Sequence, residues 1–562
     1  MSVRGLVWVF AVFSAIVSVR AADEMKPVAL LSIAGYDAQI GAVDTLADLL
    51  GQKETLDAML MMLGETEGFD KSRPAGALVL SDSQKLFAFG FLPIDDLDAL
   101  ECPGVEAFRE NYDSDTGLLT ISGDGDDAVD VQLTVRDGWC FVTAPGKESL
   151  LPEQDPLKLL DELDQDALIA GKLYADRVPA ELLDSLLAPI RQQMADIDPS
   201  QSGSFENGIK MVVSLLESLE TVSFALTVDS VSGDTVLTVD SQVKPDTQMA
   251  AIYDKMKNAE SLWSDFFQPD DSVFAMREVD FQTEEMISLV RENYKSTFKE
   301  LAEALESDMD DEEQSERMKK VLDDFTSFVD ASVGLSQLDA ACSLTNDHLF
   351  LLGGTIGGGD RLIAALDGLK EDFAAGGEGE FSELFDKVRI NESNYAGYKI
   401  STVTLSDDIA EQMAGIDPDL AGLTGAALLG VKDDALILIA GLDKKKVSEK
   451  FKALADAPRK PKPAGATVFE FSLKNVGVFL GNLLPNAEGT TATIITTLKD
   501  GSADAVITAD NQIDQRKATA RFIIRGEFFK LIGQAIEQVQ TTDVESESDT
   551  DDDLFDSTTE SL

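Results

Sequence analysis

The sequence predicts an α+β fold made of two tandem, similar halves, each an extensive curved antiparallel sheet with long amphipathic helices packed on it. Several long segments repeat apolar residues every three or four positions, which is typical of amphipathic helices. Shorter segments alternate apolar and polar residues between turn residues, which is typical of antiparallel strands. The same order of elements also recurs along the 562 residues, which indicates an internal repeat.

The N-terminus has the pattern of an export signal. Arg4 precedes an apolar run at 5–19, and Val19-Arg20-Ala21 offers residues that a signal peptidase accepts. We therefore expect residues 1–21 to be a cleaved signal peptide and the mature chain to start at Ala22. A run of about 15 apolar residues is short for a bilayer span, so we expect no stable membrane insertion and a periplasmic or extracellular location.

The first half is expected at 22–263. Its predicted strands are 27–33, 75–80, 86–92, 117–122, 130–136, 138–144, 167–174, 221–229 and 234–243. Its predicted helices are 38–50, 55–63, 94–100, 180–194, 208–219 and 246–259. Asp137-Gly138 and Ser232-Gly233 are turn residues that join two of the strand pairs.

The second half is expected at 264–540, and its opening segment 272–369 displays the repeating unit most clearly. Its predicted strands are 272–281, a hairpin at 335–353, 397–405, 425–431, 435–441, 466–473, 491–498, 503–510 and 518–524. Its predicted helices are 284–305, 318–331, 361–369, 446–455, 474–484 and 526–539. The acidic connection 306–316 should lie in solvent, because burying unpaired charge is costly.

Two segments have the composition of linkers or tails. The connection 456–463 contains three prolines and three basic residues, so it should be extended and exposed. Residues 541–562 contain nine acidic and no basic residues, with many serines and threonines. We expect this segment to be a disordered acidic tail.

The charge of the chain limits its partners. It contains 103 acidic and 46 basic residues, for a net charge of −57. Such a chain repels phosphate backbones and anionic membrane surfaces, so nucleic acid is not an expected partner. Calcium or other cations are compatible with this charge, as is a role of the charge in solubility alone.

The cysteines allow one bridge. Cys102 and Cys140 are close enough in sequence to form a disulfide in an exported protein, which leaves Cys342 unpaired. Cys342 alternates with apolar neighbours along one predicted strand, so we expect it to be a core residue.

No catalytic residue is predicted. His348 is the only histidine, which argues against catalytic triads and histidine-rich zinc sites, and we expect it to serve a turn. The glycine run 353–359 joins a strand to a helix but lacks the Lys-Ser/Thr ending of a phosphate-binding loop. Asp360 would repel an anion there, and we expect it to cap a helix instead. No cofactor is predicted.

Acidic residues are candidates for two kinds of site, a calcium loop and a catalytic carboxylate pair. Asp124, Asp126, Asp127 and Asp130 resemble a calcium loop but lack its full spacing, and a solvated turn is the simpler interpretation. A carboxylate pair for hydrolysis is an open alternative, because no pair among so many acids is singled out.

An apolar crevice between helices and sheet would suit a lipid or another apolar ligand. Phe224 and Leu226 would oppose the helix residues that line it, and ordinary core packing is the alternative. The candidate helix residues are Met211, Leu215, Phe298, Leu301, Phe325 and Phe328.

Three segments of the first half, 28–33, 69–76 and 91–97, resemble uncharacterised large exported proteins of planctomycete-type bacteria. That resemblance implies an exported protein with no assigned activity. The sequence therefore predicts an exported, non-enzymatic binding or structural protein whose partner is an unknown protein or apolar ligand. The alternatives are a lipid carrier and a carboxylate-dependent hydrolase.

Overall fold

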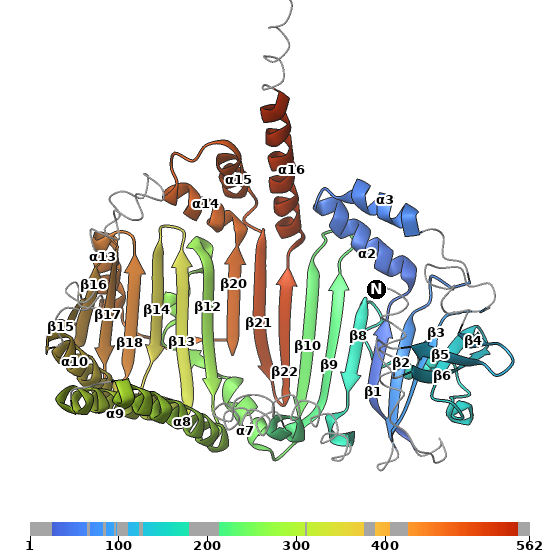
Figure 1. The fold of residues 1–562 in the computed structure, drawn as a ribbon, viewed down its shortest axis with the longest axis horizontal. Coiled ribbons are helices and arrows are strands. Elements are labelled where there is room, and N and C mark those ends of the chain that lie inside the picture. The colour runs from blue at the N-terminus through green and yellow to red at the C-terminus, as the bar shows by residue number, and fades with distance from the viewer. Residues whose placement is uncertain are drawn as a thin grey trace, which may run out of the picture. The chain divides into compact units, whose positions relative to one another are not determined.

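The computed structural model describes residues 25–63, 68–81, 86–94, 97, 111–122, 128–178, 213–308, 312–375, 388–404 and 425–548. It confirms a mixed fold of helices and large open antiparallel sheet (Figure 1). The chain forms two compact units. The first comprises Met1–Ser202, Val213–Pro245 and Lys517–Phe529, and the second comprises Gly203–Val212, Asp246–Arg516 and Lys530–Leu562.

The sheet of the first unit is antiparallel throughout its described strands. These are β1 (Lys26–Ile33), β2 (Ala75–Ser81), β3 (Leu86–Leu92), β4 (Tyr112–Asp113), β5 (Leu118–Ser122), β6 (Ala128–Arg136), β7 (Trp139–Thr143), β8 (Ile169–Leu173), β9 (Leu219–Val228), β10 (Thr235–Val243) and β22 (Lys517–Ile524). Their spatial order is β22-β10-β9-β8-β1-β2-β3-β7-β6-β5-β4.

The core of the first unit lies around β3, whose residues are all buried. Phe91 packs edge-on against Trp139 of β7, and Phe89 lies beside Phe141. The helices α2 (Tyr36–Leu49) and α3 (Lys53–Leu63) follow β1, as the periodicity predicted.

The last strand of the chain completes the sheet of the first unit. β22 pairs with β10, with Thr235 opposite Ile524 and Gln242 opposite Lys517. The β9–β10 turn also holds the residues that follow β22, because an Asp234 carboxylate oxygen accepts from the backbone N–H of Gly526 at 2.8 Å. Its second oxygen pairs with Arg525 at 2.7 Å.

The strands of the second unit are likewise antiparallel. They are β12 (Ser272–Phe281), β13 (Gln337–Thr345), β14 (Leu349–Thr355), β15 (Val388–Tyr395), β16 (Tyr398–Thr404), β17 (Ala426–Lys432), β18 (Ala435–Gly441), β20 (Thr467–Ser472) and β21 (Val506–Asp514). Their order is β21-β20-β12-β13-β14-β18-β17-β16-β15. A separate short pair joins β11 (Glu260–Ser261) to β19 (Lys462–Pro463).

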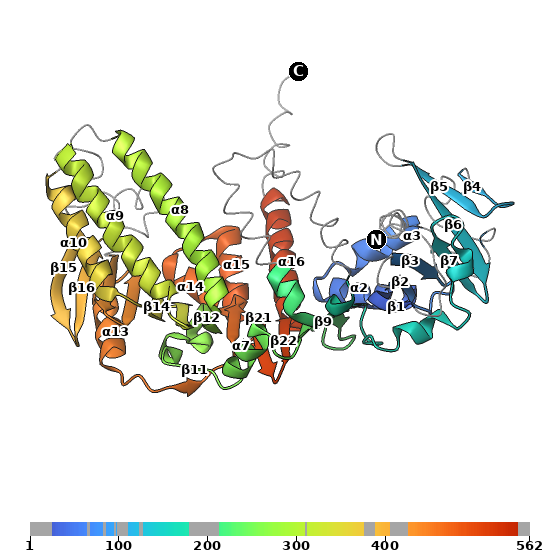
Figure 2. The same ribbon diagram turned by 90° about the horizontal axis from the view of Figure 1, so that it is seen from below.

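Long helices accompany these strands. They are α7 (Gln248–Met256), α8 (Glu284–Asp308), α9 (Glu312–Val333), α10 (Gly359–Ala375), α13 (Lys444–Asp456), α14 (Leu473–Leu483) and α15 (Gly489–Asp500), and α16 (Gly526–Ser548) starts in the first unit. α8 and α9 lie side by side, with α10 next to α9 (Figure 2). Asp330 of α9 accepts from the hydroxyl of Tyr294 on α8 at 2.5 Å, which lowers the pKa of Asp330.

One face of the sheet in the second unit is covered by the segment around Trp263 and by α13. Trp263, Tyr398 and Phe451 are almost fully buried there, among the strand residues Leu351 and Ile437. Asp339 of β13 links this covering segment to the sheet. The Asp339 carboxylate accepts from the Ser261 hydroxyl at 2.6 Å and from the backbone N–H of Leu262 at 2.7 Å.

Four elements differ from those predicted. Residues 541–548, expected to belong to a disordered tail, continue the helix α16. The segment 491–498, predicted as a strand from its threonines and isoleucines, lies in the helix α15, because Ile495 and Leu498 are buried in packing that overrides β propensity. α9 begins at Glu312, inside the connection that was expected to be a turn. The edge strand β15 was not predicted, because its sequence VRINESNY lacks a regular apolar alternation.

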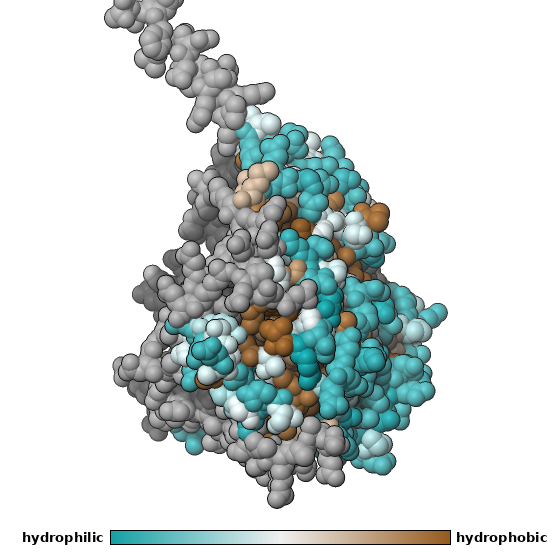
Figure 3. Space-filling model, turned by 90° about the vertical axis from the view of Figure 1, so that its right-hand side faces the viewer, coloured by the Kyte–Doolittle hydropathy of each residue, from teal (hydrophilic) through white to brown (hydrophobic). Residues whose placement is uncertain are grey.

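One face of the molecule is shown with the hydropathy of its residues in Figure 3. Viewed from the side of β3 to β6, its hydrophilic residues predominate and the hydrophobic ones form a narrow band (Figure 3). Among the described residues, no helix combines the length and apolarity that crossing a membrane requires.

Candidate functional site

The candidate site is a cavity of about 390 Å³ in the second unit, between α13 and the strands β15, β16 and β17. We call it the α13 pocket. Its volume falls in the range of roughly 300–1,000 Å³ that is typical of small-molecule sites. It is built by three stretches of chain that are separated in sequence, at 389–404, 426–428 and 444–452.

The strand register creates an apolar floor. Thr402 pairs with Leu428 and Thr404 pairs with Ala426, so these residues share one face of the sheet, since paired residues of neighbouring strands point to the same side. Ile400 lies two residues earlier on the same face and is 8% exposed. The floor is therefore made of aliphatic side chains bordered by threonine hydroxyls.

Helix α13 forms one wall because of its amphipathic sequence. Val447, Phe451 and Leu454 are buried against β17 and β18. Lys444 and Ser448 line the pocket together with Lys452 and the ring of Phe451. Because residues four apart lie on one side of a helix, positions 444, 448 and 452 form a polar line along the pocket, next to an aromatic wall.

The edge strand β15 forms the other wall through an irregular backbone. The register with β16 shifts between Arg389 and Ser393, and Asn391 takes a positive φ of 51°. The Asn391 amide holds this bulge by donating to Asp367 of α10 at 2.7 Å. Bulges redirect side chains at sheet edges, and here Arg389, Glu392 and Ser393 line the pocket.

The residues that line the pocket carry a net positive charge, whereas the whole chain is strongly negative. Three cationic side chains and one carboxylate line it, which gives +3 − 1 = +2, whereas the protein carries −57. Arg389 pairs with Glu392 at 2.9 Å. Lys444 and Lys452 have no hydrogen-bond or ion-pair partner among the residues that the structure describes, which leaves two cations available beside an apolar floor.

The start of α13 departs from the usual charge pattern of a helix. Asp443 caps it by accepting from the backbone N–H groups of Lys445 and Lys446 at 2.8 and 3.1 Å. Three lysines then occupy the first turn, where the helix dipole favours anions, with typical effects of about 0.3–1 kcal/mol per charge. A local arrangement that costs stability points to a function of these cations.

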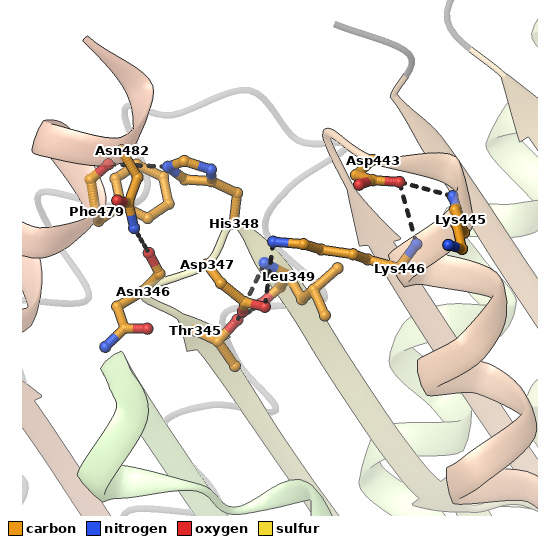
Figure 4. Close-up of polar contacts among 10 residues, drawn as sticks. All are labelled: Thr345, Asn346, Asp347, His348, Leu349, Asp443, Lys445, Lys446, Phe479 and Asn482. Carbon is orange, nitrogen blue, oxygen red and sulfur yellow. Dashed lines mark hydrogen bonds and ion pairs between the residues drawn. The ribbon is translucent and has the colours of Figure 1, made fainter. Parts of the chain in front are cut away.

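The turn 345–349 contacts the N-terminal end of α13 (Figure 4). Asp347 lies 3.7 Å from the ammonium group of Lys446. On the other side, Nε2 of His348 lies 2.8 Å from the carbonyl oxygen of Phe479 on α14, and since a carbonyl only accepts, Nε2 donates. His348 has a φ of 69°, so it serves the β13–β14 turn as expected.

Close packing explains why glycine is needed at position 359, in the glycine run that precedes α10. A Cβ atom on Gly359 would lie 1.8 Å from the carbonyl oxygen of Lys432, and the Gly359 N–H donates to the Asp433 carbonyl at 3.1 Å. The run therefore brings the start of α10 against the β17–β18 turn. The expectation that Asp360 caps the helix is wrong, because Asp360 lies inside α10, in its first turn.

The predicted cysteine bridge stays a prediction. Cys140 is a free thiol in β7, and burial raises its pKa to about 12. Cys102 lies outside the described residues. Cys342 is free and half-buried on β13, and burial raises its pKa as well.

The calcium candidates are only partly described. Asp124, Asp126 and Asp127 lie outside the described residues, and Asp130 accepts from the hydroxyl of Thr120 at 2.7 Å. Within the described ranges, no group of three or more His, Cys, Asp or Glu side chains is placed to hold a metal ion.

The crevice residues are only partly brought together. Phe325 of α9 contacts Phe298 of α8 and Phe328, with ring centroids 5.5 and 5.8 Å apart, so these rings pack against one another. Leu301 is 44% exposed. Leu215 belongs to the first unit, as do Phe224 and Leu226, and Met211 lies outside the described residues.

Sequence analysis missed the α13 pocket. The signal available was the lysine triplet before Val447, in a chain that is otherwise strongly acidic. A smaller cavity of about 220 Å³ in the first unit has mixed charges, with Arg73 stacked 3.7 Å from the ring centre of Trp139 and the acids Glu153 and Asp155 in its lining.

Comparison of the chain with protein-family models, curated proteins and solved structures finds no match. The fold and site define a two-unit α+β protein with a helix–sheet pocket, and its function has to be argued from that pocket.

Proposed function

We propose that this protein is an exported, non-enzymatic binding protein that carries a small ligand in the α13 pocket. The observation that carries the proposal is a cavity of about 390 Å³ that combines an apolar floor with two unpaired lysines. Small-molecule sites commonly join apolar walls with a few placed polar groups. The export signal expected at residues 1–21 and the acidic composition support a role outside the cytoplasm.

We also propose that the chain consists of two tandem halves. The order β9-β8-β1-β2-β3-β7-β6-β5 in the first unit is matched position by position by β21-β20-β12-β13-β14-β18-β17-β16 in the second. On this view, β10 and β22 are equivalent final strands that pair antiparallel with each other. An experimental structure whose halves do not superpose would contradict the duplication.

Blocking the pocket should remove the ligand. Leu428 is half-buried and lines the pocket, so we expect Leu428→Trp to fill a large part of its volume. Small molecules extracted from the natively secreted protein would be identified by mass spectrometry. We expect a ligand in the wild-type protein and its loss from Leu428→Trp.

The matched control is Val403→Trp. Val403 is 44% exposed and does not line the pocket, so this variant should keep the ligand. A ligand that stays with Leu428→Trp, or a wild-type protein that carries none, would refute the proposal.

A further inference from the structure

We infer that the occupant of the α13 pocket is a single-chain amphiphile with an anionic head and a tail of about ten carbons. This inference rests on the proposed function and names the ligand class. The head would lie at Lys444, Ser448 and Lys452, and the tail against Ile400, Leu428 and Phe451. Each part of the ligand follows from a different property of the pocket.

The charge of the head follows from the two lysines. Lys444 and Lys452 flank Ser448 on one side of α13, one turn of helix on either side. This arrangement offers two ammonium groups and a hydroxyl donor to one anion, which accepts charge-assisted hydrogen bonds. A cationic ligand would face the same two ammonium groups, and like charges brought together are strongly unfavourable.

The hydrogen bonds at the start of α13 indicate which groups would bind the anionic head. The Asp443 carboxylate already accepts from the N–H groups of Lys445 and Lys446 in the first turn of α13. An anion in the pocket would therefore bind the lysine side chains rather than the helix end. This dependence on side chains makes the inference testable by substitution.

The apolar tail follows from the floor. The apolar side of the pocket consists of Leu428, which is half-buried, and of Ile400, Ala426 and Phe451, which line it with at most 8% of each residue exposed. The volume of about 390 Å³ lies near the lower end of the roughly 300–1,000 Å³ that is typical of small-molecule sites. Decanoate, which has twelve non-hydrogen atoms, is therefore a suitable probe.

The test measures binding of decanoate, decyl phosphate, decanol and decyltrimethylammonium to the full-length secreted protein by calorimetry below their micelle concentrations. We expect decanoate to bind about tenfold or more tightly than decanol, because hydrogen bonds to charged groups are the stronger ones. Decyltrimethylammonium should bind more weakly still. Decyl phosphate distinguishes a phosphate head from a carboxylate head, and weaker binding of both anions than of decanol would overturn the inference.

Substitutions of the pocket lysines test where the anionic head of the ligand binds. Lys444→Gln and Lys452→Gln should each weaken decanoate binding by roughly two- to fivefold, the range expected for one exposed ion pair, and leave decanol binding unchanged. Both lysines are exposed. Lys445→Gln is the matched control, because Lys445 is in the same turn, does not line the pocket and lies 3.9 Å from Glu449. It should bind decanoate like the wild type.

The outcomes separate the inference from the proposed function. Equal affinity for decanoate and decanol, or a double lysine variant that keeps its preference for decanoate, would refute the anionic head and leave a binding protein for neutral ligands. If no probe binds and the native protein carries no extractable ligand, both the inference and the proposed function fail.

Discussion

Replacing Trp263 with alanine should lower the free energy of unfolding of the second unit by about 3–5 kcal/mol, the usual cost of truncating a buried tryptophan. The side chain is 1% exposed. Its ring packs edge-on against Phe266, and its Nε1–H donates to Thr355 at 2.9 Å. The variant would leave both a cavity and an unpaired hydroxyl.

A second consequence of this variant concerns Arg459, whose guanidinium carbon lies 3.8 Å from the centre of the Trp263 ring. Burial lowers the pKa of Arg459 to about 10, and the nearby Asp339 carboxylate opposes that effect. Without the Trp263 ring, the Arg459 guanidinium retains the more distant ring of Tyr398, whose centre is 5.4 Å away. Because the closer ring is lost, we expect loss of order beyond the cavity itself.

Hydrogen exchange followed by mass spectrometry would measure this change unit by unit. Peptides from β14 and β18 should exchange faster in Trp263→Ala, and peptides from β3 and β7 of the first unit should not change. The matched control is Leu262→Ala, because Leu262 is 39% exposed. Unchanged protection of β14 in Trp263→Ala would contradict the account of this core.

The second large effect is expected at Gly526, where the chain leaves β22. A Cβ atom there would lie 1.6 Å from the carbonyl oxygen of Ser232, so Gly526→Ala forces the β9–β10 turn away from the start of α16. We expect a destabilisation of about 1–3 kcal/mol from the overlap. Displacement of the Asp234 cap from the Gly526 N–H would add about 1 kcal/mol.

Thermal unfolding and exchange of β10 peptides would check the effect of Gly526→Ala. The control is Gly41→Ala in α2, where no atom lies within 4 Å of an added Cβ, so the helix should gain about 0.5–1 kcal/mol. Equal stability of the two variants would show that β22 does not depend on this close approach.

Periodicity predicted most of the fold because it is a local property. The apolar stripe that begins at Ile287 predicted α8, and alternation around Cys342 predicted β13. The threonine-rich segment in α15 was misread because its helix depends on burial of Ile495 and Leu498, which local propensity does not contain.

The site was harder to predict because its parts are distant in sequence. Leu428 comes next to Lys444 and Arg389 only through the order β15-β16-β17 and the packing of α13. The pairing of β22 with β10 joins residues more than 270 positions apart, such as Thr519 and Asp240. No pattern within either strand specifies its partner.

The most direct test of the central claim is a crystal structure of the secreted protein with 10-bromodecanoate, in which anomalous scattering locates the bromine. The account predicts bromine beside Ile400, Leu428 and Phe451, with the carboxylate at Lys444 and Lys452. An empty α13 pocket, or bromine bound elsewhere on the protein, would contradict it.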